Sequence, residues 1–260
     1  MNLIKENNNT KKILINHLSD FNLSQLKNSE INIFKNKKIL ITGASGVIGI
    51  NLLFFLNKIN IKKKLNIQID ATYNTSIFNF VVNYFKRDKK IKFIKKDLTN
   101  KKIKKEKKYH FIFHCAGYGQ PAKFLKFKSS VYKLNSNVII DLKDNLKKKG
   151  KFIYLSTTEI YSGNEKKCNE ESVGYTDATH PRSSYIDSKR FGESYVINCI
   201  KNYLIFRACL IYGPGTKMND ERVLNQVILR AIKNKKIDVY GGLKQFRSNL
   251  FENDAIIMMI

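Results

Sequence analysis

The sequence predicts an α/β fold built on a doubly wound parallel sheet, and three observations lead to this fold class. Short runs rich in isoleucine, leucine and phenylalanine alternate with stretches at helical spacing along most of the chain. The first such run is followed by a glycine-spaced turn at Gly43, Gly46 and Gly49. Strands that alternate with helices pair in parallel and are covered by helices on both faces.

The predicted elements begin with an N-terminal helical extension over residues 1–36. Its first residues are polar, and they are followed by apolar residues at roughly helical spacing, namely Ile13, Leu14, Leu18, Phe21, Leu23 and Leu26. The pattern then changes to a strand at 39–42, a turn and a helix over 50–59. Further strands are predicted at 67–73, 91–95, 110–115, 151–156 and 204–210. We expect one domain over 37–260, whose sheet has six or more strands and begins no earlier than Lys38.

The formal net charge of +27 comes from 48 lysines and arginines against 21 acidic residues. Such a charge is typical of proteins that bind nucleic acid or anionic membranes. Here the cations are mostly lysine, run the length of the chain and accompany abundant asparagine and isoleucine, as an AT-rich coding bias produces. Runs such as Lys147-Lys148-Lys149 are expected to solvate loops and helix ends. A nucleic-acid partner is therefore not expected.

Cysteine and histidine usage favours a reducing compartment without a metal site. The four cysteines show no paired short spacing, and Cys115 and Cys209 lie in apolar runs. His110 and His114 are four apart in a strand-like run, and no acid or cysteine completes a ligand set. No secretory signal opens the chain, and no apolar run approaches the ~20 residues that span a bilayer. The sequence thus predicts a cytoplasmic protein with no membrane insertion.

The glycine turn suits the pyrophosphate of a dinucleotide. Glycines let the chain bend sharply, let backbone N–H groups approach the phosphates and let the next helix lie close to the sheet. The N-terminus of that helix favours an anion. A Rossmann-like fold with a dinucleotide along the turn is therefore expected, and the predicted contacts are Gly43, Ser45, Gly46, Val47, Ile48 and Gly49.

Tyr185 and Lys189 add a candidate redox site. Residues four apart share one helix face, so the ammonium can lower the phenol pKa and hold the cofactor ribose. Thr157, in the strand-like run Leu155-Ser156-Thr157-Thr158-Glu159, could orient the substrate. Tyrosine near lysine on a solvated helix is the ordinary alternative in a chain rich in both. The three elements in this order favour the redox site.

Together these motifs resemble the extended short-chain dehydrogenase/reductase family over residues 38–257. The resemblance implies NAD as cofactor, with NADP as the alternative, and a homodimer. It implies Thr157, Tyr185 and Lys189 as catalytic residues, with Tyr185 and Lys189 also touching the cofactor. It further implies cofactor contacts in three places along the chain, at Asp97 and Leu98, at Ala116 and Gly117, and at Asn135.

The end of the second strand offers two residues for a ribose hydroxyl. Asp70 has the acidic character, whereas Asn74 has the better position if the strand runs on to residue 73. We favour Asn74 at the ribose, with Asp70 inside the strand.

Within the family, the chain resembles the UDP-glucuronate decarboxylases and related nucleotide-sugar enzymes. Glu159 and Arg247 match the carboxylate and the arginine of the decarboxylation step, and Tyr212-Gly213-Pro214 matches part of the nucleotide-sugar region. Thr158 stands where sugar 4,6-dehydratases carry an aspartate, which argues against dehydration. The resemblance implies a small, truncated C-terminal substrate lobe, interleaved with the Rossmann domain and built from parts of 165–182 and 212–260.

The expected activity is NAD-dependent oxidation of a nucleotide sugar to a 4-keto intermediate, followed by loss of carbon dioxide from a C5 carboxylate. A 4-epimerase is the alternative, because the same oxidation followed by re-reduction inverts C4. A 4,6-dehydratase is less favoured. A basic, non-catalytic binding protein on the same fold is the alternative from another class, since a fold does not fix its function.

Overall fold

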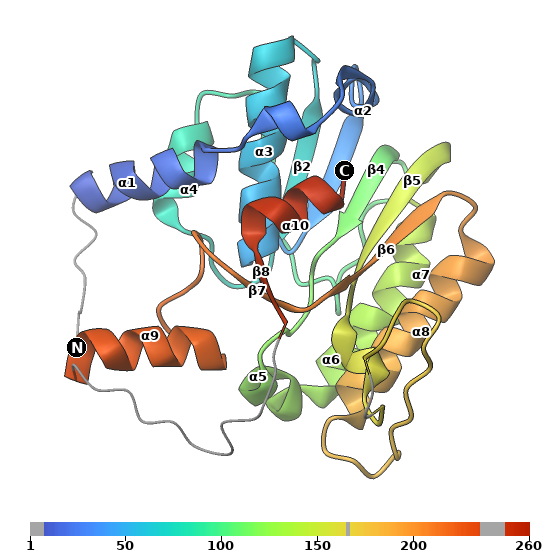
Figure 1. Cartoon of the computed structure of the whole chain (residues 1–260). Helices are drawn as coiled ribbons and strands as arrows, with labels where there is room; N and C mark the ends of the chain where they lie inside the picture. The colour runs from blue at the N-terminus through green and yellow to red at the C-terminus, as the bar shows by residue number, and fades with distance from the viewer. Residues whose placement is uncertain (1–7, 165–166, 235–247) are drawn as a thin grey trace.

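A six-stranded parallel sheet forms the centre of the computed structural model (Figure 1), which describes residues 8–164, 167–234 and 248–260. The strand order is β3-β2-β1-β4-β5-β6, with every pairing parallel. This is the order of a Rossmann sheet, so the predicted fold class is confirmed, including the start at Lys38. The strands are β1 (Lys38–Thr42), β2 (Gln68–Tyr73), β3 (Ile91–Lys95), β4 (Tyr109–His114), β5 (Leu146–Thr157) and β6 (Tyr203–Ala208).

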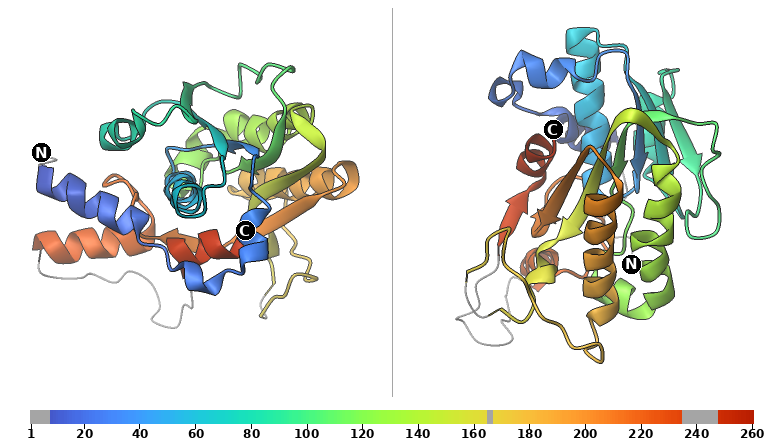
Figure 2. Two further views of the ribbon diagram at one scale, coloured as in Figure 1. Left: turned by 90° about the horizontal axis from the view of Figure 1, so that it is seen from above. Right: turned by 90° about the vertical axis from the view of Figure 1, so that its right-hand side faces the viewer.

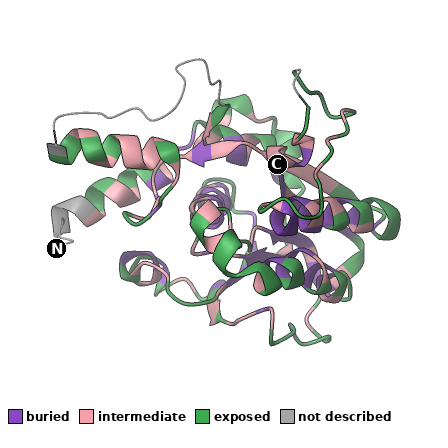
Figure 3. Cartoon of the chain, turned by 90° about the horizontal axis from the view of Figure 1, so that it is seen from below, coloured by how far each residue is buried: buried purple, intermediate pink, exposed green. Residues whose placement is uncertain are grey.

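Helices cover both faces of the sheet (Figure 2). One layer contains α3 (Val47–Lys63) and α4 (Asn79–Phe85), and the other contains α6 (Lys128–Asn135), α7 (Asn137–Lys143) and α8 (Ser183–Cys199). The short helix α5 (Pro121–Lys126) precedes α6. In Figure 3 the helices of both layers carry buried residues and present exposed ones at their outer surfaces. The sheet is therefore buried between two helical layers, as a parallel sheet requires.

Alternation along the central strands builds two hydrophobic cores. Ile39 and Ile41 of β1 point into the core beneath α3, whereas Leu40, between them, points into the core beneath α7 and α8. All three are fully buried. Successive side chains of a strand point to opposite faces, so a strand buried on both sides reads as a continuous apolar run. This is why the strand patterns in the sequence were unbroken rather than alternating.

The N-terminal extension contains α1 (Asn8–Ser19), the 3-10 turn η1 (Leu23–Gln25) and α2 (Asn28–Asn32). Phe21 packs edge-on against Phe55 of α3, with 5.3 Å between the ring centroids. Lys58 of α3 donates to the carbonyl oxygens of Ser19 and Phe21, at 2.8 Å each. The extension thus shares the core of the sheet domain, and a domain boundary at residue 36 stays a prediction.

The C-terminal part adds a second, two-stranded parallel sheet of β7 (Leu210–Tyr212) and β8 (Asn249–Phe251). Two helices belong to the same region, α9 (Val223–Asn234) and α10 (Glu252–Met258), and α10 packs on α3. Residues 167–182 contain turns and extended chain. The assignment of parts of 165–182 and 212–260 to a substrate lobe stays a prediction, as do its completeness and its role.

Two predicted strands differ from the observed ones by more than one residue at an end. The run at 204–210 is split, because the chain leaves the large sheet after Ala208 and Leu210 pairs with β8 instead. Strand β5 begins at Leu146 rather than at 151, so the prediction that Lys147-Lys148-Lys149 solvates a loop is wrong. These lysines are exposed within the strand. Among the helices that the structure describes, none combines the length and the apolar character needed to cross a bilayer.

Candidate active site

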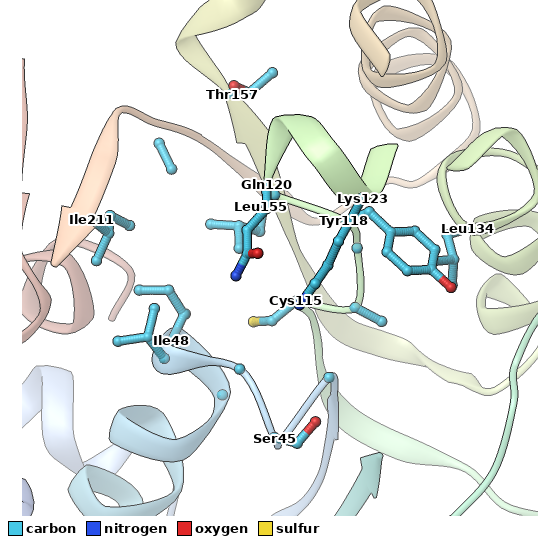
Figure 4. Close-up of a pocket in the computed structure, with 18 of the residues that line it drawn as sticks. Ser45, Ile48, Cys115, Tyr118, Gln120, Lys123, Leu134, Leu155, Thr157 and Ile211 are labelled. Carbon is cyan, nitrogen blue, oxygen red and sulfur yellow. The ribbon is translucent and has the colours of Figure 1, made fainter. Parts of the chain in front are cut away.

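A cleft of about 750 Å³ lies at the carboxyl ends of the strands. In Figure 4, Ser45 lies at one end of this pocket and Thr157 at the other, with Cys115 between them. The cleft brings together most of the predicted site residues, namely Gly43, Ser45, Gly46, Val47, Ile48, Gly49, Asn74, Asp97, Leu98, Ala116, Gly117, Thr157, Glu159, Tyr185 and Lys189. Ligands of open α/β sheets bind at this edge, where the strand order reverses.

The glycine turn packs too tightly for side chains at two of its positions. Gly43 has φ +71°, and an added Cβ would lie 2.7 Å from the backbone of Ala116. A Cβ at Gly49 would lie 2.3 Å from the carbonyl oxygen of Gly43. Gly46, the N-cap of α3, is different, because its Cβ would meet only the Gly43 oxygen, at 3.4 Å. Its open side leaves room for a ligand at the helix N-terminus, where anions are favoured.

Strand β2 runs on to Tyr73, as the favoured alternative required, so Asn74 follows it directly and lies on the cleft wall. Asp70 lies inside the strand and is buried. Its carboxylate accepts from the Tyr109 hydroxyl at 2.6 Å and pairs with Lys107 at 3.3 Å. The pKa of Tyr109 is raised, mainly because the phenol is buried and also because it is hydrogen-bonded to Asp70. Asp70 is thus committed to the core, and the contact between Asn74 and a ribose stays a prediction.

Asp97 is held by the turn that follows β3. Its Oδ1 accepts from the backbone N–H and the hydroxyl of Thr99, at 2.9 and 2.7 Å, and its Oδ2 accepts from the Asn100 amide at 3.0 Å. These bonds fix the turn so that Asp97 and Leu98 face the cleft. The carboxylate therefore shapes the wall of the cleft as well as offering an acceptor at the position predicted for the adenine.

Tyr185 is buried at the floor of the cleft. Its ring stacks on Phe124, with 4.4 Å between centroids and an interplanar angle of 4°. Burial raises the phenol pKa to about 12, although the hydrogen bond with Thr157 acts in the opposite direction. The expectation of a lowered phenol pKa is therefore wrong for the protein alone. A cationic group bound in the cleft would lower it, because an opposite charge favours the phenolate.

Lys189 lies one helical turn after Tyr185 and is also buried. Its Nζ donates to the Leu155 carbonyl at 2.7 Å and lies 4.8 Å from the centroid of the Tyr154 ring. A Cβ added at Gly117 would lie 3.9 Å from this Nζ, so the ammonium reaches the turn after β4. Burial lowers the pKa of Lys189 to about 7, against the opposing effects of Cys115 and Glu193.

Glu159 has a partner that the sequence did not reveal. Arg182 donates to it through Nε at 2.9 Å and through Nη2, and both residues line the cleft beside Tyr185. The Arg182 guanidinium carbon also lies 4.9 Å from the centroid of Phe124. The position of Arg182, three residues before Tyr185, was the available signal. Arg247, the predicted partner of Glu159, lies outside the described residues.

Asn135 is buried and is not among the residues that line the cleft, and its contact with the cofactor stays a prediction. Its amide Nδ2 donates to the Ser188 hydroxyl at 3.0 Å, and its Oδ1 accepts from Tyr154 at 3.4 Å. The side chain thus joins α6 to α8 behind the cleft. Asn135 therefore supports the helix that carries Tyr185 and Lys189.

The cleft also contains cations that the sequence motifs did not single out. Lys123, Lys217 and Arg222 line it, together with Arg182. Burial and the nearby Lys123 lower the pKa of Lys217. Arg222 is paired with Asp220 at 2.7 Å. Lys123 and Lys217 therefore give this part of the cleft a positive charge, which would favour an anionic group.

His110 and His114 do not form a metal site with other described residues, which contain no group of three or more metal-ligating side chains. His114 is fully buried, with its two ring nitrogens bonded to Thr42 and to the Leu134 carbonyl. Burial lowers its pKa to about 3. Thr42 in turn accepts from the N–H of Ala116 at 3.2 Å. His114 therefore supports the turn on which Ala116 and Gly117 lie.

A model of the NAD-dependent epimerase/dehydratase family matches residues 39–260. The chain belongs to this family. The match covers the whole Rossmann sheet and the small C-terminal sheet, so the resemblance found in the sequence is confirmed. It also accounts for the conjunction of the glycine turn with Thr157, Tyr185 and Lys189 in one cleft.

Members of the NAD-dependent epimerase/dehydratase family similar to this chain have several activities. A dTDP-D-glucose 4,6-dehydratase of Dictyostelium discoideum is 28% identical over 240 residues, which cover 85% of this chain and 54% of that protein. UDP-glucuronic acid decarboxylase 1 of Xenopus tropicalis is 26% identical over 151 residues, covering 56% of this chain and 36% of that protein. The chain thus spans about half or less of the length of these relatives.

Solved structures show the same fold. A UDP-N-acetylglucosamine 4-epimerase from Methanobrevibacter ruminantium superposes with a TM-score of 0.68 at 20% identity, covering 86% of this chain and 72% of that one. UDP-glucuronic acid 4-epimerase from Bacillus cereus superposes with a TM-score of 0.67 at 22% identity, covering 84% of this chain and 70% of that one. These similarities establish the Rossmann architecture of the family.

The cofactor of the family is NAD, and the cleft fits it. Gly43 and Gly49 are packed against backbone, whereas Gly46 is open on the side of the cleft. A pyrophosphate can therefore approach the helix N-terminus at Gly46. The turns after β2, β3 and β4 continue the same wall. At the far end, Lys189 offers a cationic donor next to Tyr185.

Proposed function

We propose that this chain modifies a nucleotide sugar through a 4-keto intermediate with NAD as the hydride carrier. The observation that supports this most is the shared cleft of Thr157, Tyr185 and Lys189 with the glycine turn. Tyr185 and Thr157 line the same cleft, and Thr157 lowers the pKa of Tyr185, so a sugar hydroxyl beside them would meet both a proton acceptor and an orienting hydroxyl. A non-catalytic binding protein would not need this arrangement.

Each group has a proposed task. The glycine turn holds the pyrophosphate, Asn74 a ribose hydroxyl, and Asp97 with Leu98 the adenine. Bound NAD supplies the hydride acceptor. Tyr185 removes the proton of the C4 hydroxyl, and Thr157 holds the oxygen from which it leaves. Lys189, whose ammonium lies near the turn at Gly117, binds the second ribose of NAD. It also provides the positive charge that favours the phenolate form of Tyr185.

Decarboxylation is the outcome that we favour for the keto intermediate. A ketone at C4 makes a C5 carboxylate a β-keto acid, which loses carbon dioxide readily. Glu159 and Arg182 form a charged pair on the cleft wall beside Tyr185. In such a pair, Arg182 can position the substrate carboxylate, and Glu159 can transfer a proton to C5 after the carboxylate has left as carbon dioxide. Arg247 is proposed as a further arginine for this step. Thr158, also on the wall, offers a hydroxyl rather than the acid expected for dehydration.

A 4-epimerase is the second candidate, and the same pair favours it. With Glu159 already bound by Arg182 at Nε and Nη2, the carboxylate is less available as a base than a solvated one. Epimerisation needs only Tyr185, Thr157 and Lys189, because the ketone rotates and is reduced from its other face. The two candidates therefore differ in whether Glu159 takes part in turnover.

A substrate panel combined with Glu159→Gln separates these candidates. For wild-type protein with NAD, we expect UDP-glucuronate to yield carbon dioxide and, once the hydride has been returned to C4 and NAD regenerated, a product lighter than the substrate by the mass of carbon dioxide. Glu159→Gln should lower carbon dioxide release by roughly 10²-fold, as loss of an acid–base group does, and should lower the initial reduction of NAD much less. The exposed Glu171→Gln is the matched control. A product of unchanged mass, formed equally well by Glu159→Gln, would identify an epimerase instead.

A homodimer through the outer surface of α6, α7 and α8 is also proposed. These adjacent helices carry large exposed apolar side chains, with Tyr132 at 46%, Ile140 at 41% and Phe191 at 45% exposure. Apolar side chains gathered on neighbouring helices are typical of a protein interface. Analytical ultracentrifugation of Ile140→Glu/Phe191→Glu should show a monomer where wild type shows a dimer. Ile61→Glu, which changes an exposed apolar residue of α3, should leave the mass unchanged. Identical masses for all three proteins would reject this interface.

A cytoplasmic protein without a nucleic-acid partner is also proposed. A cytoplasmic location is inferred from the cysteine usage, and Cys115, Cys199 and Cys209 are reduced thiols in the structure. Burial raises the pKa of Cys115, a partly buried residue of the cleft lining, to about 12, which keeps its thiol protonated and weakly nucleophilic. A nucleic-acid partner is still not expected, since the catalytic cleft alone accounts for the residues singled out in the sequence.

A further inference from the structure

A second hollow, of about 970 Å³, lies at the opposite edge of the sheet. It is formed where Lys37 precedes β1, Lys108 precedes β4 and the first residues of β5 begin, so it lies at the amino ends of these strands. The catalytic cleft lies at their carboxyl ends. Among the described residues that line the hollow, none is acidic and six are lysines, namely Lys37, Lys108, Lys147, Lys148, Lys149 and Lys151.

A β-bulge builds the lysine cluster. Tyr109 of β4 is paired with Leu146 of β5, and Phe111 is paired with Lys151. Between these two pairs, one residue of β4, His110, lies opposite residues 147–150 of β5. Residues 147–150 therefore have no partners in the parallel pairing of the two strands. Gly150 permits this, because a Cβ there would lie 2.8 Å from the Leu146 side chain and 2.9 Å from the His110 carbonyl. A bulge re-aims side chains at a sheet edge, and here it presents three lysines together.

His110 adds a second donor at the same place. Its Nδ1 accepts from the backbone N–H of Lys38 at 2.9 Å. The neutral ring therefore carries its proton on Nε2, which lies 3.2 Å from the Nζ of Lys147. Burial, Lys147 and Lys37 all lower the pKa of His110, which keeps the ring neutral. Two hydrogen-bond donors thus face each other, and an oxygen that accepts from both would relieve the conflict.

We propose that this hollow binds an anion carrying two or more linked phosphate groups. Three strand ends contribute lysines to it, so one phosphate would meet only part of the charge. Phe111, which lies in the lining beside His110, is 8% exposed, and its ring offers no platform for stacking a base. Recognition would rest on the phosphates, with one oxygen between Lys147 and His110. An inorganic polyphosphate and the phosphate chain of a nucleotide share this chemistry.

Calorimetry with inorganic tripolyphosphate tests the site on the full chain in excess NAD, which keeps the catalytic cleft occupied. Lys147→Gln/Lys148→Gln/Lys149→Gln should weaken binding at least roughly tenfold, because half of the lysines lining the hollow are lost. The control is Lys89→Gln/Lys90→Gln/Lys92→Gln, which removes the same charge from exposed lysines around the start of β3. It should bind like wild type. The bulge lysines are exposed, so circular dichroism should show all three proteins equally folded.

Two further measurements locate and identify the ligand. In ¹⁵N-labelled protein, tripolyphosphate should shift the Nε2 signal of His110 and leave that of the buried His114 in place. ATP should bind as tightly as tripolyphosphate, since the base makes no stacking contact. Equal losses in the two lysine variants would show non-specific charge attraction and overturn the proposal. An unshifted His110 signal, or binding of a single-stranded oligonucleotide but not of tripolyphosphate, would do the same.

Discussion

Tyr185→Phe is expected to lower turnover of the nucleotide sugar by roughly 10²–10⁴-fold, which is the usual contribution of a positioned acid–base group. The variant keeps the ring, and therefore its stacking on Phe124. It deletes the hydroxyl that is proposed to take the proton from the sugar. Affinity for NAD should change little, because the glycine turn and Lys189 are untouched.

The experiment compares initial rates of NAD reduction and product formation with NAD affinity from calorimetry. Tyr195→Phe is the matched control, since it removes a hydroxyl from the same helix at a residue outside the cleft lining. It should retain wild-type turnover. If Tyr185→Phe remained fully active on any nucleotide sugar, the proposed mechanism would be wrong, whichever sugar is the substrate.

Gly46→Asp is expected to weaken NAD binding by at least roughly 10²-fold, equivalent to about 3 kcal/mol. Gly46 is the N-cap of α3, and its Cβ would meet only the Gly43 carbonyl oxygen, at 3.4 Å. Aspartate is a favourable N-cap residue, so the fold should tolerate it. The added carboxylate would, however, occupy the place of the pyrophosphate and repel it.

Calorimetry of NAD binding and thermal unfolding should be measured together on this variant. Gly46→Ala separates bulk from charge, because it adds only the methyl group and should bind NAD more tightly than Gly46→Asp does. An unchanged Tm with lost NAD affinity is the expected pattern for Gly46→Asp. Wild-type affinity in Gly46→Asp would mean that the dinucleotide does not lie along the glycine turn.

Much of the fold was predictable because its signals are local. Apolar runs such as 39–42 and 110–115 report strands buried on both faces, and the glycine spacing reports the turn that joins β1 to α3. The gathering of Gly46, Asn74, Asp97, Thr157 and Tyr185 followed from topology alone. Each lies near the carboxyl end of a parallel strand or on α8 beside those ends, and those ends meet at one edge.

The sequence by itself determined the α/β class, the start of the sheet at Lys38 and the motifs of the family, because these depend on periodicity and on residues close together in the chain. Tertiary structure decided what depends on burial and on distant partners. It paired Glu159 with Arg182, and Asn135 with Ser188. It also raised the pKa of Tyr185, because the cost of desolvation depends on what surrounds the ring and not on its neighbours in sequence.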